Sequence, residues 1–215
     1  MMSDFLTDEE QAERLKRWWE QNGTSLIIGV VLAVAAVVGW RYYQGYVQDR
    51  ADAASDLFAS YVAARNEAAS TEDQLALIDT EFEGSGYHVF TLLYRADDEI
   101  EAQDWEEALA LLERAVQLAD VDTLKDIARY RVAKVLYQLD RLDDCEAQLA
   151  AIRSSGLEAL VAVLSGDVFV ARGDIERARI AYQSGIDAAR RDPANPVLGV
   201  ELMELKLASL VDESQ

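Results

Sequence analysis

Three residue types are scarce in this chain of 215 residues, and each shortage excludes a class of protein. There are two prolines, one cysteine and one histidine. Cys145 alone cannot form an intramolecular disulfide or a thiolate metal cluster, and His88 alone cannot build a histidine-rich metal site. Few prolines combined with much Ala, Leu, Glu and Asp favour helices over strands. The sequence therefore predicts an all-α protein with no cofactor.

Basic residues are also few. The chain has 20 Lys and Arg residues against 40 Asp and Glu residues, a net charge of −20. A surface this negative repels nucleic acid phosphates, so we expect no nucleic acid partner. Two interpretations of the acidic surface remain: it keeps the protein soluble, or it attracts a specific basic partner.

Catalytic motifs are missing as well. The sequence contains no Gly-rich phosphate loop, no His-Glu metal motif and no nucleophile elbow. Acidic pairs such as Asp97-Asp98 and Glu106-Glu107 are expected on helix surfaces, and His88 follows a Gly-containing turn where a helix is expected to start. We therefore expect a protein that is not an enzyme.

A long uncharged run stands near the N-terminus. Residues 26–40 carry no charge, and with their neighbours they form a segment, residues 24–43, of the length that crosses a bilayer as a helix. Aromatic and basic residues, which prefer the headgroup level, flank it. The expected membrane-interface anchors are Lys16, Arg17, Trp18, Trp19, Trp40, Arg41, Tyr42 and Tyr43.

Two other interpretations compete with a transmembrane helix. A buried helix of a soluble protein is one, and a cleaved signal peptide, with small residues at Ala33, Ala35 and Ala36, is the other; the apolar run continues past these residues, which is unusual for a cleavage region. Gly29 and Ala33 have the spacing of small residues that permits close helix contact in membranes, although exposure to lipid explains them equally well.

The first 23 residues are expected on the cytoplasmic side. Arg14, Lys16 and Arg17 precede the span and fewer basic residues follow it, a small positive-inside bias. Residues 7–21 are predicted to form an amphipathic helix with capping-box spacing between Thr7 and Glu10. Residues 44–215 would then form a domain outside the cytoplasm, in which the first helix runs on from the anchor.

A repeat organises this domain. Short apolar-rich segments start at Asp104, Arg141 and Asp174, at offsets close to the 34-residue tetratricopeptide period. The positions that recur are small (Ala96, Ala133, Gly166), small again (Ala108, Cys145, Ala178) and large (Leu112, Leu149, Tyr182). This pattern predicts a helical solenoid of the tetratricopeptide type with Cys145 in its core.

Turn and capping residues set the expected helix boundaries. Breaks are predicted at residues 84–86, 104, 122–123, 140, 154–156, 173 and 192–193. Caps are expected from Asp104, Asp140, Asp174, Thr71 with Gln74, and Thr123 with Asp126. A final helix over residues 197–211, with Leu198, Leu202, Met203 and Leu205 at helical spacing, should cover the last hairpin.

The first helix of each hairpin would line a concave groove that binds peptides or partner helices. Its candidate residues are Phe90, Leu93, Asp97, Ile100, Glu101, Tyr130, Lys134, Tyr137, Gln138, Val163, Asp167 and Ala171. Burial against neighbouring helices is the alternative for each of them. Because Lys134 is the one basic residue among them, a clamp for a C-terminal carboxylate is not expected.

The chain resembles the ancillary SecYEG translocon subunit family over nearly its whole length. The resemblance is carried by residues 15–19 (LKRWW), Asn22-Gly23, the exit of the span at residues 39–43 (GWRYY), residues 164–167 (LSGD) and Gly173-Asp174 with Tyr182. Leu157 departs from the pattern, because the family tends to have an aromatic residue there.

This resemblance implies an inner-membrane protein with a cytoplasmic N-terminus and a periplasmic tetratricopeptide-like domain. It implies association with the SecYEG translocon and with a membrane-anchored periplasmic chaperone (PpiD-like), and a role in passing exported polypeptides to periplasmic chaperones. An envelope-assembly scaffold or adaptor with no link to the translocon is the alternative.

Overall fold

The computed structural model describes residues 8–191 and 200–212, and over these ranges it contains helices and no strand. The all-α prediction is confirmed. Contacts divide the chain into two compact units, residues 1–53 and 54–215. The division falls inside one continuous helix, α1 (Asp8–Asn66). The segments expected from the sequence, 1–23, 24–43 and 44–215, refer to a membrane and stay predictions.

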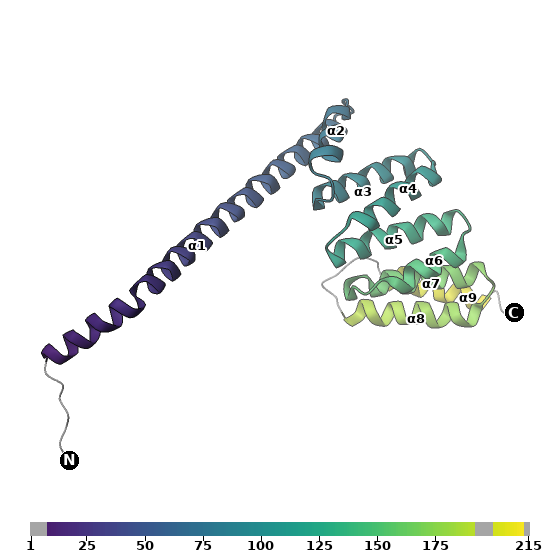
Figure 1. Cartoon of the computed structure of the whole chain (residues 1–215). Coiled ribbons are helices and arrows are strands. Elements are labelled where there is room, and N and C mark those ends of the chain that lie inside the picture. The colour runs from purple at the N-terminus through teal and green to yellow at the C-terminus, as the bar shows by residue number, and fades with distance from the viewer. Residues whose placement is uncertain (1–7, 192–199, 213–215) are drawn as a thin grey trace, which may run out of the picture. The chain divides into compact units, whose positions relative to one another are not determined.

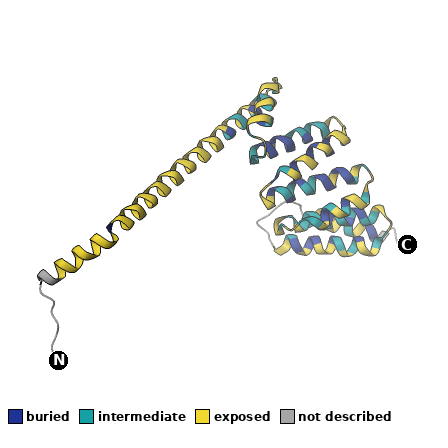
Figure 2. Cartoon of the chain, in the orientation of Figure 1, coloured by how far each residue is buried: buried dark blue, intermediate teal, exposed yellow. Residues whose placement is uncertain are grey.

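Helix α1 has 59 residues, which corresponds to a length of about 90 Å at about 1.5 Å per residue. The predicted continuation of the anchor into the next domain is confirmed, whereas Thr7 of the expected capping box lies outside the described residues. Within the described ranges, one helix is long and apolar enough to cross a membrane, and 6% of its apolar window is buried. Figure 2 shows this exposure along α1. The core helix of a soluble protein would be mostly buried, so this exposure favours a membrane span over that alternative.

The second unit is a stack of antiparallel hairpins (Figure 1). Helices α3 and α4, α5 and α6, and α7 and α8 pair in chain order, and α9 packs on α8. Their bounds are α2 Glu72–Glu81, α3 Gly86–Glu101, α4 Trp105–Leu118, α5 Asp122–Gln138, α6 Leu142–Ala151, the short 3-10 helix η1 Ser155–Leu157, α7 Glu158–Ala171, α8 Ile175–Arg191 and α9 Val200–Asp212. The predicted breaks are confirmed, with two exceptions: the one expected near residues 122–123 lies at residues 119–121, and residues 192–193 lie outside the described residues.

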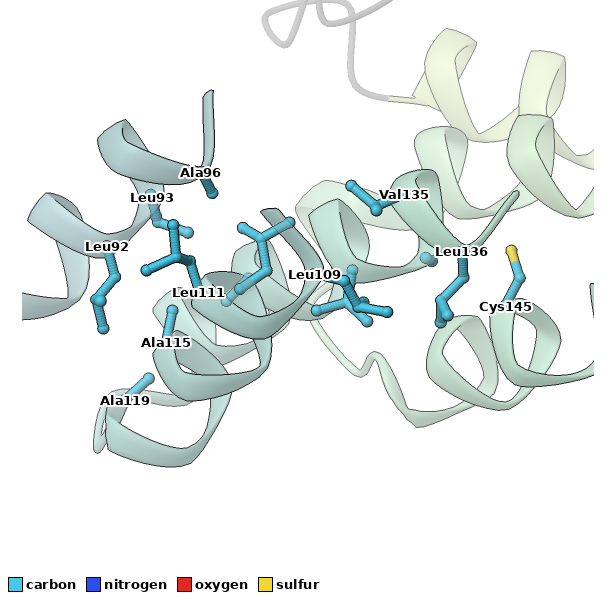
Figure 3. Packing of buried hydrophobic residues seen from close by; sticks show 14 of the residues in the cluster. Leu92, Leu93, Ala96, Leu109, Leu111, Ala115, Ala119, Val135, Leu136 and Cys145 are labelled. Atoms are coloured by element: carbon cyan, nitrogen blue, oxygen red, sulfur yellow. The ribbon is translucent and has the colours of Figure 1, made fainter. Parts of the chain in front are cut away.

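The repeat positions form the core of the stack. All nine are buried: Ala96, Ala133, Gly166, Ala108, Cys145, Ala178, Leu112, Leu149 and Tyr182. Figure 3 labels two of them, Ala96 and Cys145, among the packed hydrophobic residues. The core role of Cys145 is confirmed, and burial raises the pKa of its thiol to about 11. In the third repeat, the residue at the first small position is smaller and the residue at the large position is larger than in the other two repeats. A methyl group at Gly166 would overlap with the ring of Tyr182, which replaces the leucine of the other two repeats.

The predicted caps are confirmed at two helices. Asp104 accepts a hydrogen bond from the backbone N–H of Glu107, and Asp174 from that of Arg177. The cap expected at Asp140 is wrong, because Asp140 adopts a left-handed conformation (φ 59°) in the turn and Arg141 takes the N-cap position. Thr71 stands at the N-cap of α2, but its side chain accepts no hydrogen bond there.

Asp126 does not serve a cap at Thr123, since the N-cap of α5 is Val121, two residues earlier. The Asp126 carboxylate is 3% exposed and accepts from the backbone N–H groups of Arg153 (2.9 Å) and Ser154 (2.8 Å), and from the Ser154 hydroxyl (2.8 Å). Burial alone would raise the pKa of Asp126, but these donors and Arg129 bring it below its usual value. The carboxylate thereby fixes the loop that follows α6.

The last turns of α1, from Ala54 onward, belong to the second unit. Tyr61 is buried, and the Phe58 ring contacts the rings of Tyr87 (5.6 Å between centroids) and Tyr94 (5.9 Å) on α3. Arg65 donates from Nε to both carboxylate oxygens of Asp98, at 2.9 and 3.0 Å. The end of α1 therefore packs on α3 as the first layer of the stack.

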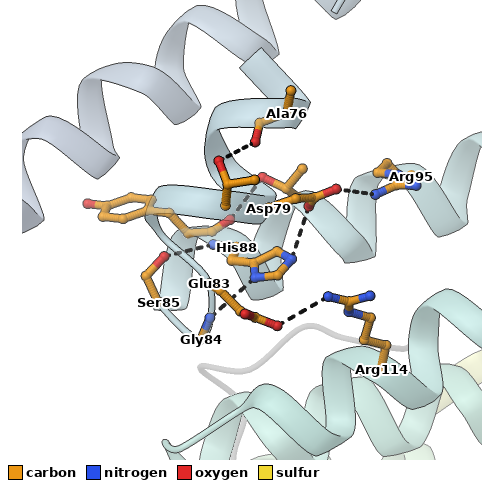
Figure 4. A network of polar contacts seen from close by, with 11 residues as sticks. Ala76, Asp79, Glu83, Gly84, Ser85, His88, Arg95 and Arg114 are labelled. Carbon is orange, nitrogen blue, oxygen red and sulfur yellow. Dashed lines mark hydrogen bonds and ion pairs between the residues drawn. The ribbon is translucent and has the colours of Figure 1, made fainter. Parts of the chain in front are cut away.

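His88 joins α2 to α3 (Figure 4). It stands in the first turn of α3, where Ser85 accepts from its backbone N–H, so the expected helix start is confirmed. Its side chain is fully buried: Nδ1 accepts from the backbone N–H of Gly84, and Nε2 lies 3.2 Å from Asp79 of α2. Burial lowers the pKa of His88, although Asp79 opposes that shift.

Helix α9 covers α8 with a different face from the one expected. Met203 and Leu210 are buried, and the prediction for Met203 is confirmed. Leu202 and Leu205 are 44% and 67% exposed, so their expected place against the hairpin is wrong. Helical spacing alone did not fix which side of the stripe faces inward. Leu198 lies outside the described residues.

Candidate functional site

The first helices of the hairpins carry the predicted groove, and polar pairs tie these helices together. Arg131 on α5 donates to both carboxylate oxygens of Asp97 on α3, each at 2.9 Å. The pair of Arg65 with Asp98 has almost the same sequence separation, 33 residues against 34. Repeat geometry thus places cations of α1 and α5 beside carboxylates of α3, the layer between them.

Asp167 on α7 is the centre of a second polar cluster. Its Oδ1 accepts from the hydroxyl of Tyr182 at 2.6 Å and pairs with the ammonium group of Lys206 on α9. Burial, reinforced by the charge of Asp167, raises the pKa of Tyr130 to about 12. The same two causes raise the pKa of Tyr137. These phenols therefore stay protonated at neutral pH and can donate hydrogen bonds.

The structure sorts the predicted groove residues by exposure. Phe90, Glu101, Lys134, Gln138 and Ala171 are exposed, and Asp97, Ile100, Tyr130, Tyr137 and Asp167 are half-buried. Leu93 and Val163 are buried in the core, so they support this face from beneath and offer no contact area. The ten accessible residues combine aromatic rings with carboxylates and amide or phenol donors, which suits hydrogen-bonded contact with a polypeptide.

Two of the cations near this face already have carboxylate partners. Arg131 binds Asp97 and Lys206 binds Asp167. Capture of a terminal carboxylate needs unpaired cations, and the anionic oxygens of Asp97 and Asp167 oppose it. The aromatic end of the face, where Phe90 is 42% exposed and lies 6.1 Å from Phe58, offers apolar contact instead.

Cavities described by the structure lie elsewhere. One, of about 630 Å³, is bordered by the loop after α6, α7 and α8 and includes Ile152, Val161, Phe169, Arg177 and Ile180. Another, of about 900 Å³, lies between α8 and α9 and includes Arg179, Ile180 and Leu207. None of the predicted groove residues lines either of them. The sequence analysis did not predict these cavities. The early break at Ser154-Ser155-Gly156, which shortens α6, is the sequence feature that could have indicated the first of them.

The expected anchors lie on α1 with exposed side chains. Trp18, Trp19, Trp40, Tyr42 and Tyr43 are all at least 48% exposed, and Lys16, Arg17 and Arg41 are exposed as well. The Trp19 indole covers Gly23, where a methyl group would come within 3.1 Å of the ring. Exposed rings at both ends of an apolar segment match the preference of Trp and Tyr for the membrane interface.

Known proteins match the chain along both units. A family model described as a tetratricopeptide repeat-like domain matches residues 16–212. The chain belongs to this family. Among curated proteins, the ancillary SecYEG translocon subunit of Escherichia coli (strain K12) is 29% identical over 209 residues, covering 97% of this chain and 99% of that protein.

Two more relatives with the same name match over nearly their full length. The protein of Haemophilus influenzae is 27% identical over 211 residues, covering 97% of this chain and 100% of the relative. That of Neisseria gonorrhoeae is 24% identical over 212 residues, covering the same shares. No solved structure matches the chain.

Proposed function

We propose that this protein is a membrane-anchored, tetratricopeptide-like subunit of the Sec translocon that helps to pass exported polypeptides to periplasmic chaperones, including a membrane-anchored one (PpiD-like). The observation that carries the proposal is the end-to-end similarity to proteins named ancillary SecYEG translocon subunits, which includes the apolar helix as well as the solenoid. A relative that shared only the solenoid would not support a place at a membrane channel.

In this proposal the protein lies in the inner membrane with residues 1–23 in the cytoplasm, residues 24–43 in the bilayer and the solenoid in the periplasm. The basic residues before the span support that orientation. Helix α1 would contact the channel through the face that holds Gly29 and Ala33, since small residues allow close approach of a second helix.

The ten accessible groove residues on α3, α5 and α7 form a surface, the first-helix face, that would contact chaperones or emerging chains. Its accessible aromatic rings and phenols suit apolar and hydrogen-bonding groups of an extended or helical segment. Its exposed and half-buried carboxylates disfavour acidic segments. The face holds no constellation that would process a bound chain, and binding and release are what a hand-off requires.

Photo-crosslinking in living cells tests the proposal. A photoreactive phenylalanine replaces Ala33 in the span, with Val31 as the control, because two residues on an ideal helix differ by about 200°. A second pair compares Lys134, exposed on the first-helix face, with Glu106, exposed on α4. Adducts are identified by mass spectrometry.

Adducts of Ala33 with the Sec channel that are weaker from Val31, and adducts of Lys134 with periplasmic chaperones or exported chains, are the expected results. Cytosolic partners at Lys134 would reverse the orientation and end the export role. Envelope-assembly proteins at Lys134 with no channel adduct at Ala33 would favour the scaffold.

A further inference from the structure

Helix α6 is shorter than its equivalents in the stack. It has 10 residues, whereas α4 has 14 and α8 has 17. The chain leaves α6 at Ala151, about one helical turn earlier than α4 would predict. Helix α7 consequently packs closely on α8 but only sparsely on α6.

The cavity of about 630 Å³ lies at this missing turn. Ile152 and Val161 pack against the core cluster of α3 to α6, which also includes Leu164 and Val168 of α7, whereas Phe169 packs against the cluster of α7 to α9. Both clusters therefore reach the cavity but leave it unfilled. Ile180, on its edge, is 68% exposed, although side chains of this type are usually covered.

The rim of the cavity is held in place. Asp126, itself buried, binds the backbone of Arg153 and Ser154 and the Ser154 hydroxyl, as described above. Both Arg153 and Ser154 line the cavity. A loop fixed by a buried carboxylate does not close easily over the space beside it, so the opening is preformed.

Charge at the rim has the opposite sign to the chain as a whole. Two cations, Arg153 and Arg177, and one carboxylate, Glu158, line the cavity. Arg191 pairs with Glu158, and Arg177 pairs with Asp174 and lies over the Phe169 ring, so Arg153 is the lining cation with no carboxylate partner among the described residues. Arg153 donates to the carbonyl oxygens of Ala150 and Ile152 and makes no ion pair among the described residues. An anionic partner would therefore meet an unpaired guanidinium here, in a chain whose net charge is −20.

We infer that this cavity is a second docking site, which takes an amphipathic helical segment of another protein that carries acidic residues. The apolar side chains of this segment fill the space of the missing turn, beside Ile180 and Val161, and its carboxylates lie against Arg153. The volume falls within the range of pockets that hold apolar ligands. The site shares no lining residue with the first-helix face, so it does not depend on the proposed function.

Fluorescence anisotropy with the full-length protein in lipid nanodiscs tests this inference. The probe is a labelled amphipathic helical peptide of about four turns with leucines on one face and glutamates beside them; its twin has lysine in place of each glutamate. Measurements at physiological ionic strength limit the long-range repulsion by the acidic chain, since screening acts beyond about 8 Å.

Binding of the acidic peptide should be at least about tenfold tighter than that of its lysine twin. Ile180→Asp should weaken it more than about tenfold, because an apolar contact is lost and a negative charge is added. Arg153→Glu should weaken it about threefold or more. Leu205→Asp is the matched control, since Leu205 is 67% exposed but does not line the cavity, and it should change nothing.

Several results would overturn the inference. Equal binding of the two peptides, an equal effect of Leu205→Asp, or no binding of either peptide would do so. A photoreactive residue at Ile180 of the same protein separates the other occupants. A cross-link to a second copy, or to residues 192–199 of its own chain, would assign the cavity to that occupant instead.

Discussion

The third hairpin pairs a smaller residue with a larger one than the other two hairpins do, and this difference gives the sharpest test of the packing. Gly166 faces Tyr182, whereas Ala96 and Ala133 occupy the equivalent positions in hairpins that carry Leu112 and Leu149. Changing Gly166→Ala introduces a methyl group that overlaps with the Tyr182 ring, which is 3% exposed and has little room to move.

The expected cost follows from three effects. Overpacking a core costs about 1–3 kcal/mol. A displaced Tyr182 also loses its hydrogen bond to the Asp167 carboxylate, worth about 1.5–3 kcal/mol. Alanine inside a helix recovers about 1 kcal/mol relative to glycine. The free energy of unfolding should therefore fall by about 1.5–5 kcal/mol.

Urea unfolding of the full-length protein in detergent micelles, followed by circular dichroism, measures this change. The apolar part of α1 stays helical in the micelle, so the transition reports the solenoid. The double variant Gly166→Ala with Tyr182→Leu recreates the pairs of the other hairpins. It should be more stable than the sum of the two single effects by at least about 1 kcal/mol. A Gly166→Ala protein as stable as the parent, or strict additivity, would refute this explanation of the packing.

Three further predictions concern buried polar groups. Asp126→Ala should cost about 2–4 kcal/mol in urea unfolding, because three donors of Arg153 and Ser154 lose their acceptor, while Asp122→Ala, at an exposed position, should cost less than about 0.5 kcal/mol. The pKa of His88 is lower in the folded than in the unfolded protein, so the free energy of unfolding should fall as the pH drops from about 6.5 toward the folded pKa, by at most about 1.4 kcal/mol per pH unit. His88→Gln should remove this part of the pH dependence. An unchanged pH dependence in that variant would exclude His88 as its source. Cys145, whose pKa is about 11, should react with a thiol reagent at pH 8 only in unfolded protein, and rapid reaction of the native protein would contradict its burial.

The sequence predicted those parts of the fold that depend on local chemistry and on the repeat. The apolar run, the Asp104 and Asp174 caps and the nine repeat positions each follow from residue type and spacing. Asp126 could not be placed in this way, because its partners lie 27 and 28 residues further along the chain. Likewise, the residue type and position of Asp140 predict a helix cap, but the geometry of the turn places it in the left-handed conformation instead.

The candidate site was predictable in part. The first-helix register named residues that do lie together on α3, α5 and α7, but it could not separate buried Leu93 from exposed Phe90, since both fall on the same helical stripe. The cavity beside α6 depends on a difference in helix length between hairpins. A search for what repeats is insensitive to such a difference, because the information lies in the departure from the repeat.

The end of α1 has a consequence for how the protein can be cut. Ala54 and Tyr61 are buried, and Phe58 and Arg65 contact α3, although all four belong to the helix that also carries the apolar segment. A protease or a gene truncation that separates the chain after residue 66 would leave the first layer of the solenoid with the membrane fragment and strip an aromatic surface from α3. A soluble fragment that keeps its first layer must begin before Ala54, so the natural boundary for dissection lies within an unbroken helix and not at a loop.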